Sequence, residues 1–303
     1  GIVMAIIFLF GFIAFVFFRN YGGNSFWEYI GVFSAVVISF FMGLIDDIKA
    51  SSPFFKFLMQ VFVALKIILS GVYINVFSIP VLNIILTFFW VVGIMNSFNM
   101  LDNMDAISGS VSLIILITIL LVALTGGNSN LFYLVINVTT IATLISFLRW
   151  NWNPSKIYMG DNGSQFIGII LSVLSIKFLW NNNDCNIIEF VNLRSLGIVL
   201  LVFIVPVSDT FSVTLNRILR STSPFVGGKD HTTHNLSYMG LSDRMVAVVF
   251  FFATLITNSI ALYYVFSTKQ FEVNDFFIVL SIVLFVLLLF YSFTILGRKK
   301  NQK

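Results

Sequence analysis

The sequence predicts an all-α, polytopic membrane protein with ten transmembrane helices, and two observations lead to this. Of the 303 residues, 58% are apolar and only 10% are charged, whereas a soluble domain carries about 25% charged residues. The apolar residues form long continuous runs without the alternation that is typical of a membrane β-barrel. A single cysteine, Cys185, excludes an internal disulfide and a multi-cysteine metal site. Composition therefore excludes a soluble enzyme and a nucleic-acid-binding protein.

Ten apolar runs approach the roughly 20 residues that a helix needs to cross a hydrocarbon core about 30 Å thick. They cover residues 2–18, 26–45, 54–73, 80–100, 107–125, 130–148, 165–180, 196–216, 245–266 and 276–296. Because backbone polar groups find no water in the bilayer, each run is expected to form a helix. No internal repeat is visible, so residues 1–303 are expected to form one integral-membrane domain.

Polar connections separate these runs in chain order and fall into two alternating sets. The first set comprises residues 46–53, 99–105, 149–164, 217–244 and the tail 298–303. The second set comprises residues 19–25, 72–80, 125–130, 181–195 and 267–275. Alternation of this kind is expected when successive spans cross the bilayer in opposite directions.

Basic residues favour one set strongly, and this predicts the orientation. The first set carries Lys49, Arg149, Lys156, Arg217, Arg220, Lys229, Arg244, Arg298, Lys299, Lys300 and Lys303. The second set carries Arg19, Arg194 and Lys269. The positive-inside rule therefore places the first set in the cytoplasm. Gly1 opens directly within an apolar run, so we expect one further helix before it, eleven in the full-length protein.

Acidic side chains also gather in the predicted cytoplasmic set, and all of them are Asp. Asp46 and Asp47 close the run 26–45. At a helix C-terminus the macrodipole disfavours each acidic side chain by about 0.3–1 kcal/mol. A divalent cation bound to these carboxylates would make their interaction with the site favourable. The alternative is that these acids only mark the water boundary.

Asn96, Asn99, Asp102 and Asp105 follow one another at intervals of three, which places them along one stripe of a helix. Such a stripe at membrane depth should face protein or water. Amide and carboxylate oxygens suit a hard cation such as Mg²⁺, which prefers few carboxylates together with phosphate oxygens. A polar seam between two helices is the alternative.

Two longer loops complete the polar set. In residues 150–164, Asp161 lies between glycines and Ser164 precedes the next span, as at sites where backbone approaches an anion; a solvated turn is the alternative. The loop 217–244 carries Arg217, Arg220, Lys229, His231, His234 and Arg244, which could bind a diphosphate. Asp230, His231 and His234 could instead form half a zinc site, or the loop could be structureless.

Taken together, these motifs resemble the polyprenyl-phosphate N-acetylhexosamine-1-phosphate transferases, a glycosyltransferase family 4 type of membrane enzyme. The resemblance is carried by an ordered set that covers most of the chain. The set consists of Asp46-Asp47 followed by Lys56 to Gln60, Asn96-Ser97-Phe98-Asn99-Met100-Leu101-Asp102-Asn103-Met104-Asp105-Ala106, Met159 to Ser164, and Ser223-Pro224-Phe225 with Asp230-His231-Thr232-Thr233-His234. The family's eleven helices agree with the expected missing first helix and first cytoplasmic loop.

The chain departs from the family pattern at three positions. Asn103 and Ala106 replace the two glycines of the family's D-G-x-D-G segment, and Thr233 replaces the middle histidine of H-x-H-H. The three-histidine run of the phospho-N-acetylmuramoyl-pentapeptide transferases is absent, which argues against a muramoyl-pentapeptide substrate. The glycine replacements put the local turn geometry in question.

The resemblance implies that N-acetylhexosamine-1-phosphate, with GlcNAc as the expected sugar, passes from a UDP-sugar to undecaprenyl phosphate with release of UMP. This would be the first membrane step of a cell-envelope polysaccharide, with the site on the cytoplasmic face of the bacterial inner membrane. The implied cofactor is Mg²⁺, with Mn²⁺ as a substitute, and a homodimer is compatible with the family.

The resemblance also assigns roles to residues. The implied catalytic residues are Asp46, Asp47, Asp102 and Asp105. The implied metal ligands are Asp161, Asp102 and Asp105. The implied substrate-binding residues are Lys56, Asn96, Asn99, Arg217, Arg220, His231 and His234.

Two other functions compete with this interpretation. A secondary transporter with an acidic cation-coupling site predicts charges near the bilayer midplane and repeated halves, and Lys66 is the plain mid-span charge. An intramembrane aspartyl protease needs two aspartates inside spans, whereas Asp161 follows a polar loop.

Overall fold

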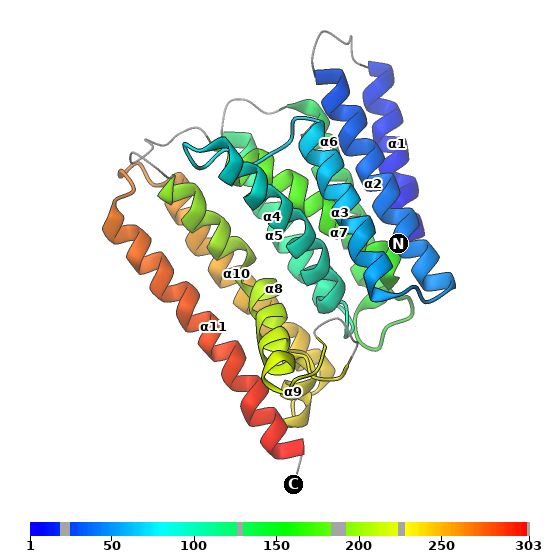
Figure 1. The fold of residues 1–303 in the computed structure, drawn as a ribbon. Helices are drawn as coiled ribbons and strands as arrows, with labels where there is room; N and C mark the ends of the chain where they lie inside the picture. The colour runs from blue at the N-terminus through cyan, green and yellow to red at the C-terminus, as the bar shows by residue number, and fades with distance from the viewer. Residues whose placement is uncertain (19–24, 126–129, 183–191, 224–227, 302–303) are drawn as a thin grey trace.

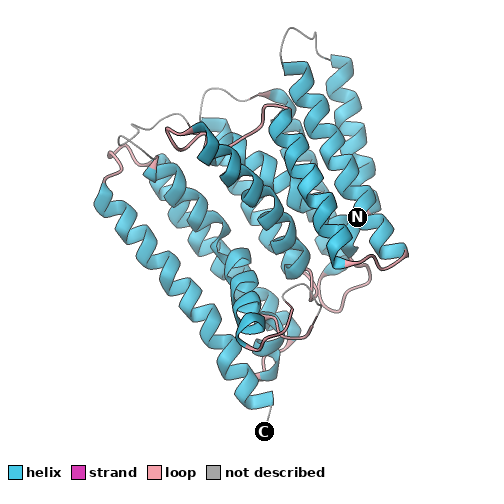
Figure 2. Ribbon diagram, in the orientation of Figure 1, coloured by secondary structure: helices cyan, strands magenta, loops and turns pink. Residues whose placement is uncertain are grey.

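Helices make up the regular structure of this chain. The computed structural model describes residues 1–18, 25–125, 130–182, 192–223 and 228–301. In chain order the helices are α1 (Ile2–Phe18), α2 (Ser25–Ile48), α3 (Pro53–Leu69), α4 (Pro80–Leu101), α5 (Ile107–Thr125), α6 (Leu131–Asn151), α7 (Gly160–Ser175), its π-helical continuation η1 (Ile176–Trp180), α8 (Leu193–Leu219), α9 (Thr232–Tyr238), α10 (Asp243–Phe266) and α11 (Val273–Asn301). These ranges contain no strand (Figure 2), so the all-α class is confirmed.

The multi-pass membrane architecture is confirmed, but the predicted number of ten spans is not. In the described ranges, eight helices are long and apolar enough to cross a membrane: α2, α4, α5, α6, α7 with η1, α8, α10 and α11. The runs 2–18 and 54–73 form α1 and α3, which have only 17 residues each. The short helix α9, within the polar loop 217–244, was not predicted.

The long helices stand side by side, with α1 and α11 at opposite flanks and α7 in the middle (Figure 1). Every residue of α7 from Asn162 to Ser175 is buried, and α7 packs mainly against α2 and α4. A Cβ atom added at Gly43 of α2 would lie 2.3 Å from the carbonyl oxygen of Asp161, and one at Gly168 would lie 2.8 Å from Cα of Met95. These small residues let α7 approach both neighbours closely, which brings the ends of the three helices together.

A proline shapes α8 before it reaches the polar end of the molecule. Pro206 lies inside this helix, and it has no N–H to donate to the carbonyl group four residues earlier. Asn258 of α10 satisfies that carbonyl, because its Nδ2 donates to the Val202 oxygen at 3.1 Å. The part of α8 that follows this supported proline carries Asp209 and Arg217 and runs toward the end of the molecule at which α9 lies (Figure 1).

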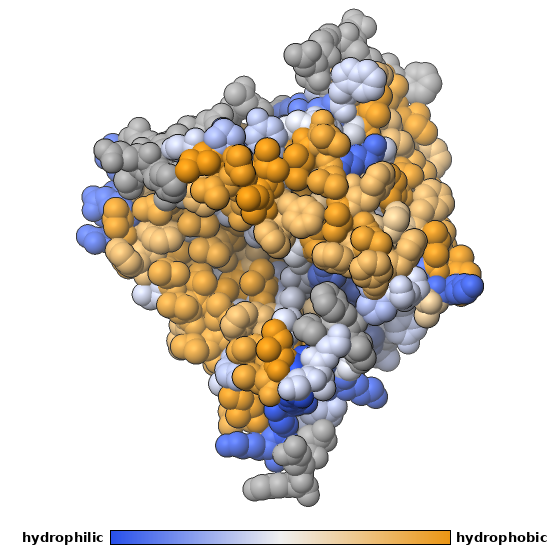
Figure 3. Space-filling model, viewed as in Figure 1, coloured by the Kyte–Doolittle hydropathy of each residue, from blue (hydrophilic) through white to orange (hydrophobic). Residues whose placement is uncertain are grey.

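The surface divides as expected for a protein in a bilayer. Apolar side chains cover the flank of the bundle, and polar side chains gather at its ends and in a hollow between the helices (Figure 3). Lys66, predicted to lie in mid-span, is in the last turn of α3. The charge expected of a transporter at the midplane is therefore not supplied by this residue.

Candidate active site

Four helix ends bring the predicted polar residues together at the end of the bundle that carries α9 in Figure 1. Asp46 and Asp47 lie in the last turn of α2, and Lys56 lies in the first turn of α3. Asn99 lies in the last turn of α4, and Asp161 in the first turn of α7. Ser52 caps α3 by accepting from the Phe55 N–H at 3.2 Å, which starts α3 directly after a short turn from α2.

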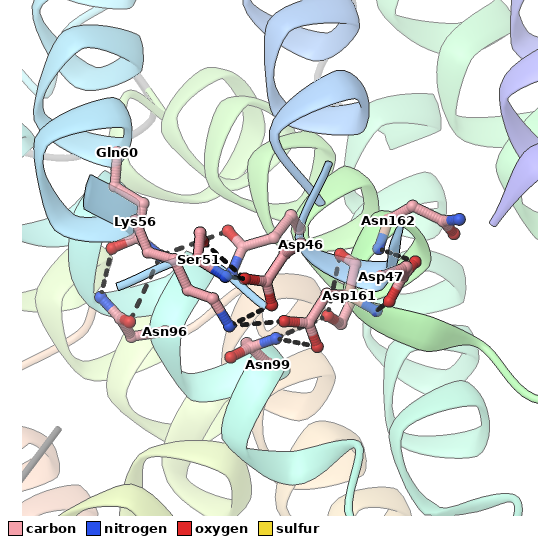
Figure 4. Close-up of polar contacts among 11 residues, drawn as sticks. Asp46, Asp47, Ser51, Lys56, Gln60, Asn96, Asn99, Asp161 and Asn162 are labelled. Carbon is pink, nitrogen blue, oxygen red and sulfur yellow. Dashed lines mark hydrogen bonds and ion pairs between the residues drawn. The ribbon is translucent and has the colours of Figure 1, made fainter. Parts of the chain in front are cut away.

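Lys56 joins two of these carboxylates. Its Nζ forms an ion pair with Asp46 and lies 2.7 Å from Oδ2 of Asp161 (Figure 4). The backbone N–H of Ser51 also donates to Oδ1 of Asp46, at 2.8 Å. The ammonium group lets two acidic side chains from distant parts of the chain share one half-buried place without repulsion.

Asp47 holds the start of α7. Its Oδ1 accepts from the Asp161 N–H at 2.8 Å and its Oδ2 from the Asn162 N–H at 3.1 Å (Figure 4). A carboxylate at this position satisfies N–H groups that the first turn of a helix leaves unpaired, and it interacts favourably with the helix dipole. Gly160 enters the helix with φ of +69°, a conformation that glycine adopts without strain.

Amide side chains surround the acidic pair. Nδ2 of Asn99 donates to Oδ1 of Asp161 at 3.1 Å and to the Ser164 hydroxyl at 3.0 Å. Gln60 and Asn96 exchange a pair of hydrogen bonds of 3.3 and 2.7 Å. These bonds fix the register of α3 against α4, so Lys56, one turn before Gln60, points at the carboxylates.

Asp102 and Asp105 take different positions after α4. Asp102 is the C-cap residue of α4; burial, followed by the repulsion of Asp161, raises the pKa of its carboxyl group to about 7. Asp105 instead holds the loop before α7, because its Oδ2 accepts from Asn153 Nδ2 at 3.0 Å and from the Ser155 N–H at 3.1 Å. Its predicted roles in catalysis and metal binding stay predictions.

A second cluster forms where α8 meets α9. The guanidinium group of Arg217 binds both carboxylate oxygens of Asp230, at 2.8 and 2.6 Å. Burial opposes ionisation of Asp230, but the Arg217 hydrogen bonds hold its pKa below the ordinary value. Nδ1 of His231 lies 3.1 Å from Oδ2 of the buried Asp209. Asp230 was predicted only as part of a half zinc site and of a family motif, and Asp209 was not predicted as a site residue; an Asp inside the apolar run 196–216 was the available signal for Asp209.

His234 and Arg220 lie beside this cluster. The ring of His234 stands edge-on to that of His231, with 6.1 Å between their centres. Burial and the neighbouring His231 lower the pKa of His234, which favours its neutral form. Arg220 is exposed at the end of α8. The Pro224 and Phe225 positions of the S-P-F segment lie outside the described residues.

A cleft of about 640 Å³ runs between the two clusters. Lys56, Gln60, Asn96 and Asn99 line one wall, and Arg217 and His231 line the other. Asn103 also lines it and accepts a 2.6 Å hydrogen bond from the Thr233 hydroxyl at the start of α9. Figure 3 shows this region as a hollow with polar walls between apolar surfaces.

Beside the cleft, where α4 ends and α7 begins, the donor atoms fit a hard cation. Asp102 and Asp161 supply carboxylates, and Asn99 donates through Nδ2, which leaves its Oδ1 to accept. Mg²⁺ takes one or two carboxylates and completes its shell with water and phosphate oxygens. Among the described residues, no three His, Cys, Asp or Glu side chains group as a metal site, so such an ion would depend on a phosphate ligand.

Comparison with known proteins identifies the chain's relatives. Residues 29–179 match the model of glycosyl transferase family 4. A probable undecaprenyl-phosphate N-acetylglucosaminyl 1-phosphate transferase of Bacillus subtilis (strain 168) is 34% identical over 231 residues, which is 73% of this chain and 61% of the relative.

More distant relatives carry two kinds of name. The decaprenyl-phosphate N-acetylglucosaminephosphotransferase of Mycolicibacterium smegmatis is 29% identical over 69% of this chain and 57% of its own length. A phospho-N-acetylmuramoyl-pentapeptide-transferase of Streptococcus uberis is 31% identical over 51% of each chain. The alignments with the two N-acetylglucosamine relatives span about 60% of their lengths.

Proposed function

The chain belongs to glycosyl transferase family 4, and from this premise we propose that it transfers N-acetylhexosamine-1-phosphate from a UDP-sugar to undecaprenyl phosphate and releases UMP. The names of its two N-acetylglucosamine relatives favour GlcNAc as the sugar. The reaction would open the synthesis of a cell-envelope polysaccharide. The resemblance also leaves a homodimer as a prediction.

The observation that carries this proposal is the placement of Lys56 between Asp46 and Asp161 on the wall of the cleft. Phosphoryl transfer depends on positioning and on charge neutralisation more than on covalent chemistry of the protein. A cation held between two carboxylates, at the end of a membrane bundle, is suited to receive the phosphate of a lipid. The opposite wall, with His231 and Arg217, binds the soluble nucleotide.

On the acceptor side, Lys56 binds the lipid phosphate and holds it against Asp46. The second pKa of a phosphate monoester is near 6, so little base strength is needed to expose an attacking oxygen. Asp46 orients this oxygen through the Lys56 ammonium group that it shares with the phosphate. Asp47 acts through α7, because its two hydrogen bonds place Asp161.

On the donor side, the residues of α8 and α9 orient the UDP-sugar across the cleft. His231 offers a ring nitrogen and Arg217 a guanidinium edge, each already fixed by a carboxylate. Asp161, Asp102 and the Oδ1 atom of Asn99 are the groups that would hold Mg²⁺. The ion would neutralise the negative charge of the diphosphate and so stabilise UMP as it leaves.

The proposed site lies on the cytoplasmic side of a bacterial inner membrane. The basic residues Arg298, Lys299 and Lys300 end α11 at the same end of the molecule as α9, and positive charge favours the cytoplasmic side. We further propose that α1 and α3 also cross the bilayer, which would make ten spans.

The test uses purified protein in detergent with Mg²⁺, undecaprenyl phosphate and a panel of UDP-sugars, and it measures UMP release. We expect release with UDP-GlcNAc and loss of turnover in Asp161→Asn. Asp243→Asn, the same chemical change at the start of α10, is the matched control and should keep turnover within about twofold. No UMP from any donor would remove the enzyme proposal; an active Asp161→Asn variant would remove the role of Asp161.

A further inference from the structure

We propose that Asp209 is a positioning residue for the donor substrate: its buried carboxylate fixes His231 so that Nε2 of the imidazole faces the cleft. This inference rests on the proposed function. Asp209 lies in α8, three residues after Pro206, and it is 0% exposed. Asp209 belongs to none of the family motifs that carry the resemblance, so those motifs assign it no role.

The contacts of Asp209 define what it can do. Its Oδ2 lies 3.1 Å from Nδ1 of His231, and its Oδ1 accepts from the backbone N–H of Thr232 at 2.8 Å. A buried carboxylate is stable only when its oxygens are hydrogen-bonded, and here each oxygen has one donor. Since a carboxylate only accepts, Nδ1 must carry the hydrogen. The tautomer of His231 is therefore fixed, and Nε2 is the nitrogen left for a ligand.

His231 lies where its Nε2 atom can contact a substrate in the cleft. The residue is itself largely buried, yet it lines the cleft opposite Lys56. One residue earlier, Asp230 holds Arg217 of the same wall with two hydrogen bonds. Both nitrogen-bearing side chains of this wall are thus set by a carboxylate before any substrate arrives. Preorganised groups of this kind do not have to be ordered when the UDP-sugar binds: Nε2 of His231 can accept from an O–H or N–H group of the donor, and Arg217 can donate to its diphosphate.

A purely structural role for Asp209 makes a different prediction. In that case the carboxylate serves only to attach the first residue of α9 through the Thr232 N–H. Its loss would then disturb α9 whether or not position 231 is a histidine. If Asp209 acts through the imidazole, its loss has no effect once the imidazole is gone.

The experiment is therefore a double-mutant cycle of Asp209→Asn and His231→Asn. Asparagine at position 209 keeps an oxygen for the Thr232 N–H, and asparagine at position 231, the N-cap of α9, is a favoured N-cap residue. Thermal unfolding in detergent verifies that each variant is folded. UMP release is measured against the concentration of UDP-GlcNAc and, separately, of undecaprenyl phosphate. Asp243→Asn again serves as the control.

We expect each single variant to lower kcat/KM for UDP-GlcNAc by about 10- to 100-fold, as for other carboxylates that orient a functional histidine. KM for UDP-GlcNAc should rise while KM for the lipid is unchanged. The double variant should match His231→Asn within about twofold. Effects that multiply, or an equal change in both KM values, would overturn the inference while leaving the proposed function in place. Wild-type protein that releases no UMP would overturn both.

Discussion

The placement of Asp161 by Asp47 predicts a strong effect of the substitution Gly160→Ala. Gly160 has φ of +69°, where an L-residue costs about 1–2 kcal/mol. A Cβ atom there would lie 2.9 Å from Oδ2 and 3.2 Å from Oδ1 of Asp47, so the carboxylate must move. Losing its hydrogen bonds to the first turn of α7 adds about 0.5–2 kcal/mol, the usual value of an N-cap. The expected total is about 1.5–4 kcal/mol.

Gly71 provides a matched control for this substitution. It follows α3 with φ of +88°, and a Cβ atom added there would have nothing within 4 Å. Gly71→Ala therefore carries the same backbone cost of about 1–2 kcal/mol without a contact to any acid. The difference between the two variants isolates the displacement of Asp47.

The assay compares UMP release and thermal unfolding of both variants with the wild type. Because a misplacement of about 1 Å at a reacting centre can cost about 100-fold in rate, Gly160→Ala should lose turnover on that scale. Gly71→Ala should unfold at a lower temperature but keep turnover within about threefold. Equal turnover in the two variants would refute the reasoning that Asp47 places Asp161.

Further predictions concern the cleft and its cofactor. Lys56→Met should lower turnover about 10- to 100-fold, because hydrogen bonds to a charged group are lost. The variant should also bind Mn²⁺ more tightly in equilibrium titrations, because the ammonium group no longer competes for the carboxylates. Weaker Mn²⁺ binding would contradict this prediction. Ala106→Gly should raise the unfolding temperature, since Ala106 has φ of +63° and relief of about 1–2 kcal/mol exceeds the entropy cost of glycine; a lower temperature would speak against strain. EDTA should stop UMP release and added Mg²⁺ or Mn²⁺ should restore it, whereas full activity in EDTA would exclude the metal. Asn103→Gly and Thr233→Ala should each weaken thermal stability by about 1 kcal/mol without adding in the double variant; additive losses would show that their bond contributes nothing.

The helical class followed from the sequence because a bilayer leaves few alternatives. Continuous apolar runs such as 107–125 have to satisfy their backbone internally, so their position along the chain was enough to find α5 and its neighbours. The number of spans was harder to predict, because α1 and α3 have 17 residues each, fewer than the roughly 20 that a span needs. The helix α9 was missed because its seven residues include a single aliphatic side chain, Leu236, and so carry no hydrophobic period.

The candidate site was predictable in its residue types and less so in its pairings. The sequence placed Asp46, Asp47 and Asp161 at one face, and the structure brings them together through Lys56 and the N-terminus of α7. It could not show that Asp105 faces the loop at Asn153, since a spacing of three residues gives a stripe only while the helix continues. The helix α4 ends at Leu101, and beyond it the stripe no longer exists.

Two of the three replacements that distinguish this chain from the family pattern, Asn103 and Thr233, are in direct contact. Asn103 stands where the family has a glycine and Thr233 where it has a histidine, 130 positions apart, and the Thr233 hydroxyl donates to Oδ1 of Asn103 at 2.6 Å. A glycine at position 103 would offer no side chain to this hydroxyl, and the buried Thr233 would lose its partner. Each of these two side chains therefore makes this hydrogen bond only when the other is present. The bond also joins the turn after α4, which carries Asp102, to the start of α9, which follows His231, so the two walls of the cleft meet through these side chains. We therefore expect donor selectivity to vary with this pair rather than with Asp102 and Asp161, which would hold the Mg²⁺ that neutralises the diphosphate of every UDP-sugar.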